Sequence, residues 1–114
     1  MKWVKGRQES GYYKMKIFIS GYFKCDMYLL KFNKGSLIDP HVDPVNDEYE
    51  HHRINIILKK AKDGGVFICK NTIFSNSFIK YFRPDVEEHS VTRINRGNRY
   101  VLSIGWLKQK NKKK

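Results

Sequence analysis

The sequence predicts an all-β domain, either a sandwich or a jelly roll. Aromatic residues make up 14% of the chain and stand with Val and Ile in short runs, a composition that favours strands. Turn signals rich in Gly, Pro, Asn and Asp separate these runs at the spacing of about 8–12 residues that is typical of such folds. No apolar pattern with helical period extends over ten or more residues, so helices contribute little to the expected fold.

The first half of the chain contains four of the predicted strands. A Lys-Gly-Ser turn ends the second of them, and a polar loop over 43–52 separates the third from the fourth. The fourth, "RINIILKK", has the apolar run "IIL" at its centre, which is typical of a buried strand. The predicted strands are 12–20, 25–33, 37–43 and 53–60.

Four more strands are predicted in the second half, which gives about eight in all, a number that fits a jelly roll. The turn "AKDGG" precedes the first of them and "RGN" precedes the last. Glycine is expected at such turns because it adopts positive φ without strain. These predicted strands are 66–71, 77–84, 89–95 and 99–107.

Length and charge limit the class of protein. The 114 residues are enough for one domain, which we place at 1–107, followed by a lysine-rich tail over 108–114. No apolar run reaches the roughly 18 residues of a membrane helix, and the first residues do not resemble a secretory signal. Two cysteines do not imply a disulfide, so we expect a cytoplasmic protein. The net charge of +12 favours polyanionic partners without specifying one.

The stretch "DPHVDP" holds the first candidate for a functional site. His41 and Asp43 are two apart, so on an extended chain they point to the same side. The two prolines that flank them, Pro40 and Pro44, favour that extended conformation. An imidazole and a carboxylate side by side are two of the three ligands in a 2-His-1-carboxylate iron site.

A third ligand must come from elsewhere in the chain, and His89 is the best candidate. It opens a predicted strand that can lie face to face with the His41 strand in a sandwich. His51 and His52 are rivals. They fall in the predicted polar loop, and adjacent strand residues point to opposite faces, so at most one of them can join the site.

Arg99 is the candidate for binding an anion near this site. It opens the apolar strand "YVLSIGWL" ten residues after His89, one hairpin turn away. An antiparallel pairing of the two strands would bring it near His89. A guanidinium suits a carboxylate because its planar fork donates two parallel hydrogen bonds. The alternatives are an ion pair of Arg99 with a loop carboxylate, or Arg93 or Arg96 in its place.

Together these motifs resemble the iron(II)- and 2-oxoglutarate-dependent dioxygenases, in particular the prolyl-4-hydroxylase-like branch. The resemblance covers about Tyr28 to Leu107 and rests on "YLLKFNKGSLIDPHVD", "RINIILKKAKDGGVFI" and "HSVTRINRGNRYVLSIGWL". It implies a double-stranded β-helix, a jelly roll of the cupin type. It also implies that His41, Asp43 and His89 bind Fe(II) and that Arg99 binds the distal carboxylate of 2-oxoglutarate.

Further residues take candidate roles from the same resemblance. Tyr28 and Asn55 are candidates for hydrogen bonds to 2-oxoglutarate, with a structural role in the core as the alternative. Many relatives have Arg-x-Ser, whereas Val101 stands at that position here, and Ser103 is the candidate to replace the missing serine. The implied reaction uses O2 as the oxidant, and ascorbate is expected to support it.

The predicted function is hydroxylation of an unactivated C–H bond in a peptide or protein substrate. An oxygenase acting on a nucleic-acid base is the alternative that the charge favours. Two further classes stay open: a non-catalytic jelly roll that retains the metal site, and a small basic nucleic-acid-binding protein. No membrane partner is expected. A homodimer is one way to complete so small a core.

Overall fold

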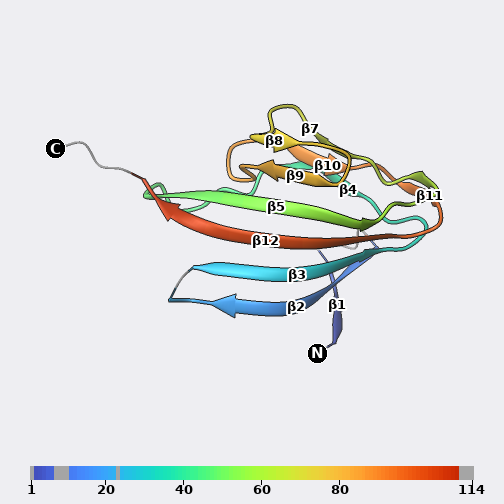
Figure 1. Cartoon of the computed structure of the whole chain (residues 1–114), viewed down its shortest axis with the longest axis horizontal. Helices are drawn as coiled ribbons and strands as arrows, with labels where there is room; N and C mark the ends of the chain where they lie inside the picture. Colours follow the sequence, from blue (N-terminus) through green and yellow to red (C-terminus); the bar gives the residue numbers. More distant parts are fainter. Residues whose placement is uncertain (1, 7–10, 23, 111–114) are drawn as a thin grey trace.

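The structure, a computed structural model, describes residues 2–6, 11–22 and 24–110. Over these residues the chain forms twelve β-strands and no helix, which confirms the predicted fold class (Figure 1). The strands are β1 (Trp3–Lys5), β2 (Tyr12–Ser20), β3 (Cys25–Phe32), β4 (Ile38–His41), β5 (Tyr49–Lys59), β6 (Asp63–Gly64), β7 (Phe67–Cys69), β8 (Phe74–Ser75), β9 (Ile79–Phe82), β10 (His89–Val91), β11 (Ile94–Arg96) and β12 (Arg99–Gln109).

One large sheet and two small ones make up the jelly roll. The large sheet has seven strands in the order β1-β2-β3-β12-β5-β9-β8. A three-stranded sheet, β4-β10-β7, and the pair β11-β6 lie across part of it (Figure 1). All pairings are antiparallel, and the two long strands β5 and β12 run side by side through the middle of the large sheet.

The start of β5 differs from the sequence prediction. Residues 49–52 were predicted to lie in a polar loop, but β5 begins at Tyr49 and pairs there with the end of β12 (Gln109 opposite Tyr49, Leu107 opposite His51). The polar sequence carried no strand pattern, and the long-range pairing imposes the strand. His51 and His52 are therefore strand residues, with His51 on the inner face and His52 on the outer face.

A second difference concerns the neighbours of β12. We expected β12 to pair with the His89 strand, because one short turn joins the two. Instead β10 lies in the small sheet between β4 and β7, while β12 lies in the large sheet between β3 and β5. The short pair β11-β6 occupies the turn region and carries the chain from one sheet to the other.

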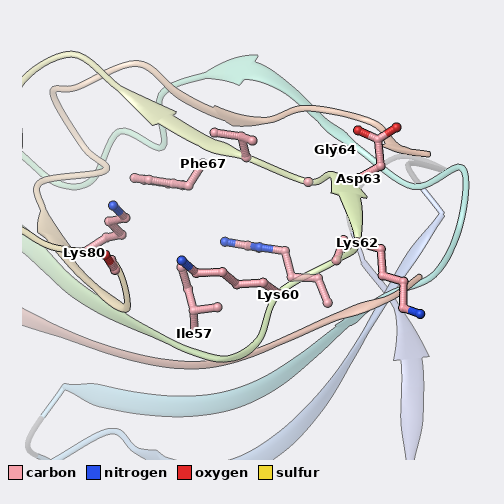
Figure 2. A pocket seen from close by; sticks show the side chains of 12 residues that line it. Ile57, Lys60, Lys62, Asp63, Gly64, Phe67 and Lys80 are labelled. Carbon is pink, nitrogen blue, oxygen red and sulfur yellow. The ribbon is translucent and has the colours of Figure 1, made fainter. Parts of the chain in front are cut away.

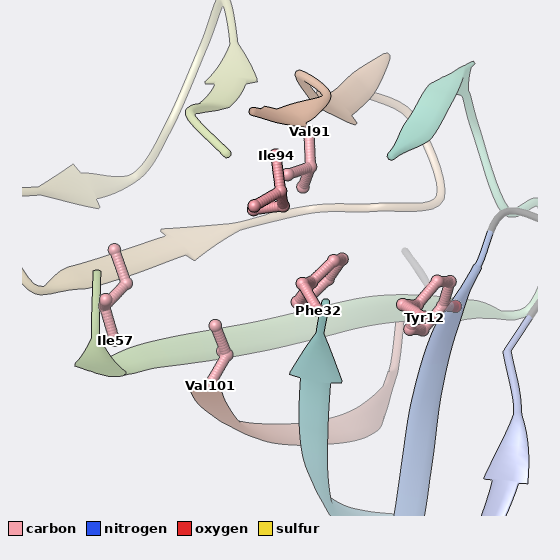
Figure 3. Packing of buried hydrophobic residues seen from close by; sticks show 6 residues of the cluster. All are labelled: Tyr12, Phe32, Ile57, Val91, Ile94 and Val101. Atoms are coloured by element: carbon pink, nitrogen blue, oxygen red, sulfur yellow. The ribbon is translucent and has the colours of Figure 1, made fainter. Parts of the chain in front are cut away.

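The hydrophobic core fills the space between the sheets. Its centre consists of six buried side chains, two from the small sheets and four from the large sheet, and Figure 3 shows them facing one another. Burial of each such side chain contributes about 1.5–3 kcal/mol. They are Val91 and Ile94 above and Tyr12, Phe32, Ile57 and Val101 below. The metal-ligand candidates lie to one side of this core.

The ends of the predicted domain also fall within or beside described strands. β12 runs to Gln109, so its last residues include the first part of the predicted tail 108–114, of which 111–114 lie outside the described residues. Across residues 2–6, 11–22 and 24–110 there is no helix of the length and apolar character needed to cross a lipid bilayer.

Candidate metal centre

His41, Asp43 and His89 meet at one edge of the small sheet. His41 ends β4 and His89 opens β10, and the two are opposite each other in the antiparallel register. The histidines thus lie side by side in one sheet, not face to face across the sandwich as expected. Asp43 follows in the loop, where its backbone N–H donates to the carbonyl of the buried Pro84 at 2.8 Å.

The three side chains point one ligand atom each toward a common centre. These atoms all lie within 4.8 Å of one another. The Asp43 Oδ2 atom is 3.4 Å from Nε2 of His41 and 3.4 Å from Nε2 of His89. Both imidazoles are mostly buried, whereas the carboxylate is about 42% exposed. The group is therefore reached from solvent on the carboxylate side.

Backbone carbonyls fix the tautomer of both histidines. His41 Nδ1 lies 2.7 Å from the carbonyl oxygen of Asp39, and His89 Nδ1 lies 2.9 Å from that of Glu87. A carbonyl only accepts, so each Nδ1 carries the proton and donates it. In the neutral imidazole each Nε2 then offers a lone pair toward the carboxylate, which is also an acceptor. Three converging acceptors fit a bound cation, and the carbonyls supply the outer support typical of metal-binding histidines.

A cavity of about 290 Å³ opens beside this group. Three of the residues predicted to bind cofactor, Tyr28, Asn55 and Ser103, line it together with the metal-ligand candidates. They come from adjacent strands, since Ser103 is opposite both Asn55 and Tyr28 in the register. Asn55 is 9% exposed, and its Oδ1 atom has no hydrogen-bond partner. The cavity therefore holds a buried polar group that a ligand could satisfy.

Arg53 is a residue of this cavity that the sequence analysis missed. Its guanidinium donates to Asp26 Oδ1 at 2.7 Å and to Ser103 Oγ at 2.6 Å. It crosses β12 at Gly105, where a Cβ atom would collide with the guanidinium. A glycine inside an apolar strand indicates such a close approach, and that signal was available in "SIGWL".

His51 lines the same cavity but stands outside the three-ligand group. Its Nε2 atom is 3.4 Å from Arg53 Nη2, which can only donate, so Nδ1 carries the proton in the neutral ring. That Nδ1 atom is buried and has no partner. Burial lowers the pKa of His51, and the cation of Arg53 adds to the effect. His52 points to the other face of β5 and does not line the cavity; its ring contacts Glu50 and Tyr81.

Arg99 lines a second, neighbouring cavity. Along β12 it is two residues before Val101, and Ser103, which lines the first cavity, is two residues after Val101. This second cavity has about 410 Å³ and contains four cationic side chains against the single carboxylate of Asp63. Figure 2 shows Lys60, Lys80 and Phe67 around it. Arg99 is 3% exposed, its Nη2 atom has no partner, and burial lowers its pKa to about 10. Its guanidinium carbon lies 5.0 Å from the centre of the Phe32 ring.

A thin wall of side chains separates the two cavities. Phe67 lines the Arg99 cavity and Phe82 lines the metal cavity, and their ring centroids are 4.9 Å apart. Phe82 in turn lies 5.1 Å from the His89 ring. The alternative arginines line neither cavity: Arg93 is exposed and donates to the Gly35 carbonyl, and Arg96 is exposed in β11. Of the three arginines considered in the sequence analysis, Arg99 alone is buried and lines a cavity beside the candidate ligands.

Comparison with known proteins supports the fold. No protein-family model and no curated protein matches the sequence. Among solved structures, KdgF from Halomonas sp. is similar over 96% of this chain and 88% of its own, with a TM-score of 0.64 and 14% identity. A cupin-superfamily sugar phosphate isomerase from Silicibacter pomeroyi is similar over 90% and 67%, with a TM-score of 0.55 and 10% identity.

A third similar structure is the viral collagen prolyl hydroxylase from Paramecium Bursaria Chlorella virus-1, solved as a 2OG complex. The match covers 88% of this chain and 62% of that one, with a TM-score of 0.56 and 14% identity. The chain thus has the cupin, or double-stranded β-helix, fold. These neighbours include a hydroxylase and an isomerase, so the fold alone leaves the reaction open.

Proposed function

We propose that the chain is an Fe(II)- and 2-oxoglutarate-dependent oxygenase that hydroxylates a peptide substrate. One observation carries the proposal: two imidazoles with a fixed Nε2 lone pair and one carboxylate converge on a single point. This ligand set, with open positions left over, is typical of non-haem Fe(II) oxygenases. The similar structure of a prolyl hydroxylase with 2OG is consistent with it.

The residues present also fit the cosubstrate. Arg99 is a buried cation whose Nη2 atom lacks a partner, and a carboxylate would satisfy it. When bound, the metal and 2-oxoglutarate would supply the oxidising chemistry. The chain would hold the metal with His41, Asp43 and His89, and it would limit water through the buried walls of the two cavities. Because Phe67 and Phe82 stand between Arg99 and the ligand group, the proposal requires these rings to turn aside for the cosubstrate.

A metal titration is the first test. Asp43→Ala should weaken Mn(II) or Fe(II) binding by more than about a hundredfold, since even the loss of a residue that merely supports a ligand costs 10- to 100-fold. Asp39→Ala is the matched control, because Asp39 is exposed and contacts His41 only through its backbone. Calorimetry would measure both variants. Equal metal affinity of Asp43→Ala and the parent would refute the assignment.

The reaction itself needs a second measurement. Incubation with Fe(II), 2-oxoglutarate, O2 and ascorbate should release succinate and add one oxygen to a substrate peptide, as seen by intact mass. Oxygen added to an oligonucleotide instead would favour the nucleic-acid alternative, which rests on the net charge of +12. Metal binding without 2-oxoglutarate binding would favour a non-oxygenase cupin. The contact between the Phe67 and Phe82 rings supports that alternative, because it closes the path between Arg99 and the ligand group.

A further inference from the structure

The large sheet extends beyond the small sheets on the side of β1, β2 and β3. Figure 1 shows these three strands on the side of β12 that faces away from β4, β7 and β10. Tyr12 and Phe32 on their inner face are buried in the core, whereas Lys16 and Ile19, farther along β2 on the same face, are exposed. A hollow of about 410 Å³ lies over this face, and its lining residues define what we call the β1–β3 platform: Lys2, Val4, Lys14, Lys16, Ile19 and Tyr28.

The platform adjoins the metal cavity directly. Lys14 and Tyr28 line both hollows. The strand register agrees, because Lys16 is opposite Tyr28 on β3, and Tyr28 is opposite the buried Ser103 on β12. The platform residues thus lie on the inner face of the large sheet, and the metal-ligand candidates, which belong to the small sheet and its loop, line the adjoining cavity with two of them. A chain lying on this face would lead straight to His41, Asp43 and His89.

The chemistry of the platform is cationic and apolar. Three of its six described residues are lysines, and none of the six carries a carboxylate. Val4 and Ile19 are 48% and 52% exposed, so apolar contact area is also available. Lysines side by side without an acidic partner repel one another, and an anionic ligand relieves that repulsion. The ligand that fits carries negative charges and apolar groups together.

These features favour a peptide over a nucleic acid. Single-stranded nucleic acids bind by stacking bases on open aromatic faces. Among the described residues that line the hollow, Tyr28 alone has an aromatic ring, and the Lys14 ammonium lies 5.2 Å from its centre. The other five platform residues offer no aromatic face to a base. Aliphatic side chains between ammonium groups instead suit a peptide with alternating acidic and apolar residues.

We propose that the β1–β3 platform binds an acidic segment of the peptide substrate. Carboxylates of the segment pair with Lys2, Lys14 and Lys16, and apolar side chains rest on Val4 and Ile19. The inference rests on the proposed function only in calling this peptide the substrate. The binding itself needs no metal and no turnover, so it can be tested separately.

Fluorescence anisotropy would test the platform in the presence of a chelator. The probes are a labelled peptide of alternating Glu and Leu, the same peptide with Gln in place of Glu, and an oligothymidylate of similar length. We expect the Glu peptide to bind with an affinity that falls with salt. Lys14→Glu/Lys16→Glu should weaken that binding by about tenfold or more, a range reached by reversing a few close charges.

Lys34→Glu/Lys70→Glu is the matched control. It makes the same change in net charge at two exposed lysines outside the platform, and a loss of less than about twofold is expected there. Circular dichroism would verify that both double variants are folded. Equal losses in the two variants, equal affinity for the Gln peptide, or tighter binding of the oligothymidylate would each overturn the proposal. Asp43→Ala should lose metal binding but still bind the Glu peptide. A parent protein that binds the peptide but not the metal would support the platform and contradict the proposed reaction.

Discussion

Two arginines reach inward from the large sheet, and their surroundings are opposite. Arg53 is held by Asp26, Ser103 and His51, so its charge and its donors are satisfied. Arg99 is more deeply buried, faces the Phe32 ring, and retains a donor without a partner. Burial lowers the pKa of Arg99 to about 10, whereas Arg53 has a carboxylate at 2.7 Å.

Under the proposed function, the difference would separate a structural arginine from a ligand-binding one. A satisfied guanidinium organises the protein around itself, and its removal leaves a carboxylate unpaired. An unsatisfied guanidinium costs free energy in the empty protein and is retained where a ligand supplies the anion. Arg53 therefore organises the cavity beside His41, Asp43 and His89, and in the proposed function Arg99 is the cation that would pair with a dicarboxylate.

The largest expected effect is on stability. Arg53→Ala should lower the free energy of unfolding by roughly 2–4 kcal/mol, somewhat below the range for a fully buried pair because Asp26 keeps some solvent contact. Arg99→Leu should leave it unchanged or raise it by up to about 2 kcal/mol, because an unpaired buried charge is removed. Urea denaturation of the metal-free protein would compare them. Similar losses in both variants would erase the distinction.

For 2-oxoglutarate affinity, we expect the substitution of Arg99, rather than that of Arg53, to have the larger effect. Arg99→Ala should raise the dissociation constant of 2-oxoglutarate about 10- to 100-fold, since a charge-assisted pair contributes about 1.5–3 kcal/mol. Arg99→Lys should recover part of the loss, as a point charge without the planar fork. Calorimetry with Mn(II) present would measure both, and metal affinity should stay the same. Normal 2-oxoglutarate binding by Arg99→Ala would assign the carboxylate to another group or exclude this cosubstrate.

Gly105 gives a smaller test of how firmly Arg53 is held. A methyl group at this position meets the guanidinium, and the arginine cannot move without loosening its contacts to Asp26 and Ser103. We expect Gly105→Ala to cost about 1–2 kcal/mol of unfolding free energy, within the range for overpacking. In an Arg53→Ala background, Gly105→Ala should lower the unfolding free energy much less, because the guanidinium is gone. Thermal denaturation of the parent, the two single variants and the double variant would measure this coupling, and additive losses would contradict it.

The smallest expected effect is the pH response of His51. Burial lowers the pKa of His51 in the folded protein below its usual value of 6.5, with Arg53 as a second cause. The unfolded chain then takes up a proton before the folded chain does. Stability from this residue is complete above pH 6.5 and is lost as the pH falls below it. The urea midpoint of the parent should therefore fall relative to that of His51→Gln as the pH is lowered below 6.5; a constant difference between them would contradict this.

Strands were predictable from the sequence where apolar and polar residues alternate along the chain. In "RYVLSIGWL" the buried Arg99, Val101 and Ser103 alternate with half-buried neighbours, so the strand was visible. The start of β5 was not, because Tyr49 to His52 is polar and is held as a strand by the distant end of β12. Two- and three-residue strands such as β1, β6 and β8 are too short to show a period, and they too depend on pairing.

The sequence indicated which candidate ligands come together, but not what surrounds them. The spacing of His41 and Asp43 and the resemblance indicated which residues to bring together, and the structure places His89 beside them. Spacing could not reveal that β10 and β12 belong to different sheets, so the separation of Arg99 from the ligand group by Phe67 and Phe82 was not foreseen. The role of Arg53 depends on Asp26, which is 27 residues earlier in the chain.

The edge of the large sheet has a consequence for solubility. β1 pairs with residues 13–15 of β2, and no strand of the described ranges 2–6, 11–22 and 24–110 pairs with the outer edge of the following stretch "KIFIS" (16–20), where Ile17, Phe18 and Ile19 are exposed. Such an edge is a template for unwanted pairing between molecules. An irregularity in the pairing between Lys16 and Phe18 bends the strand there, and Lys16 adds a charge. Together they interrupt what would otherwise be a flat strand edge prone to intermolecular pairing, so straightening this bulge or neutralising Lys16 would promote fibrous aggregation.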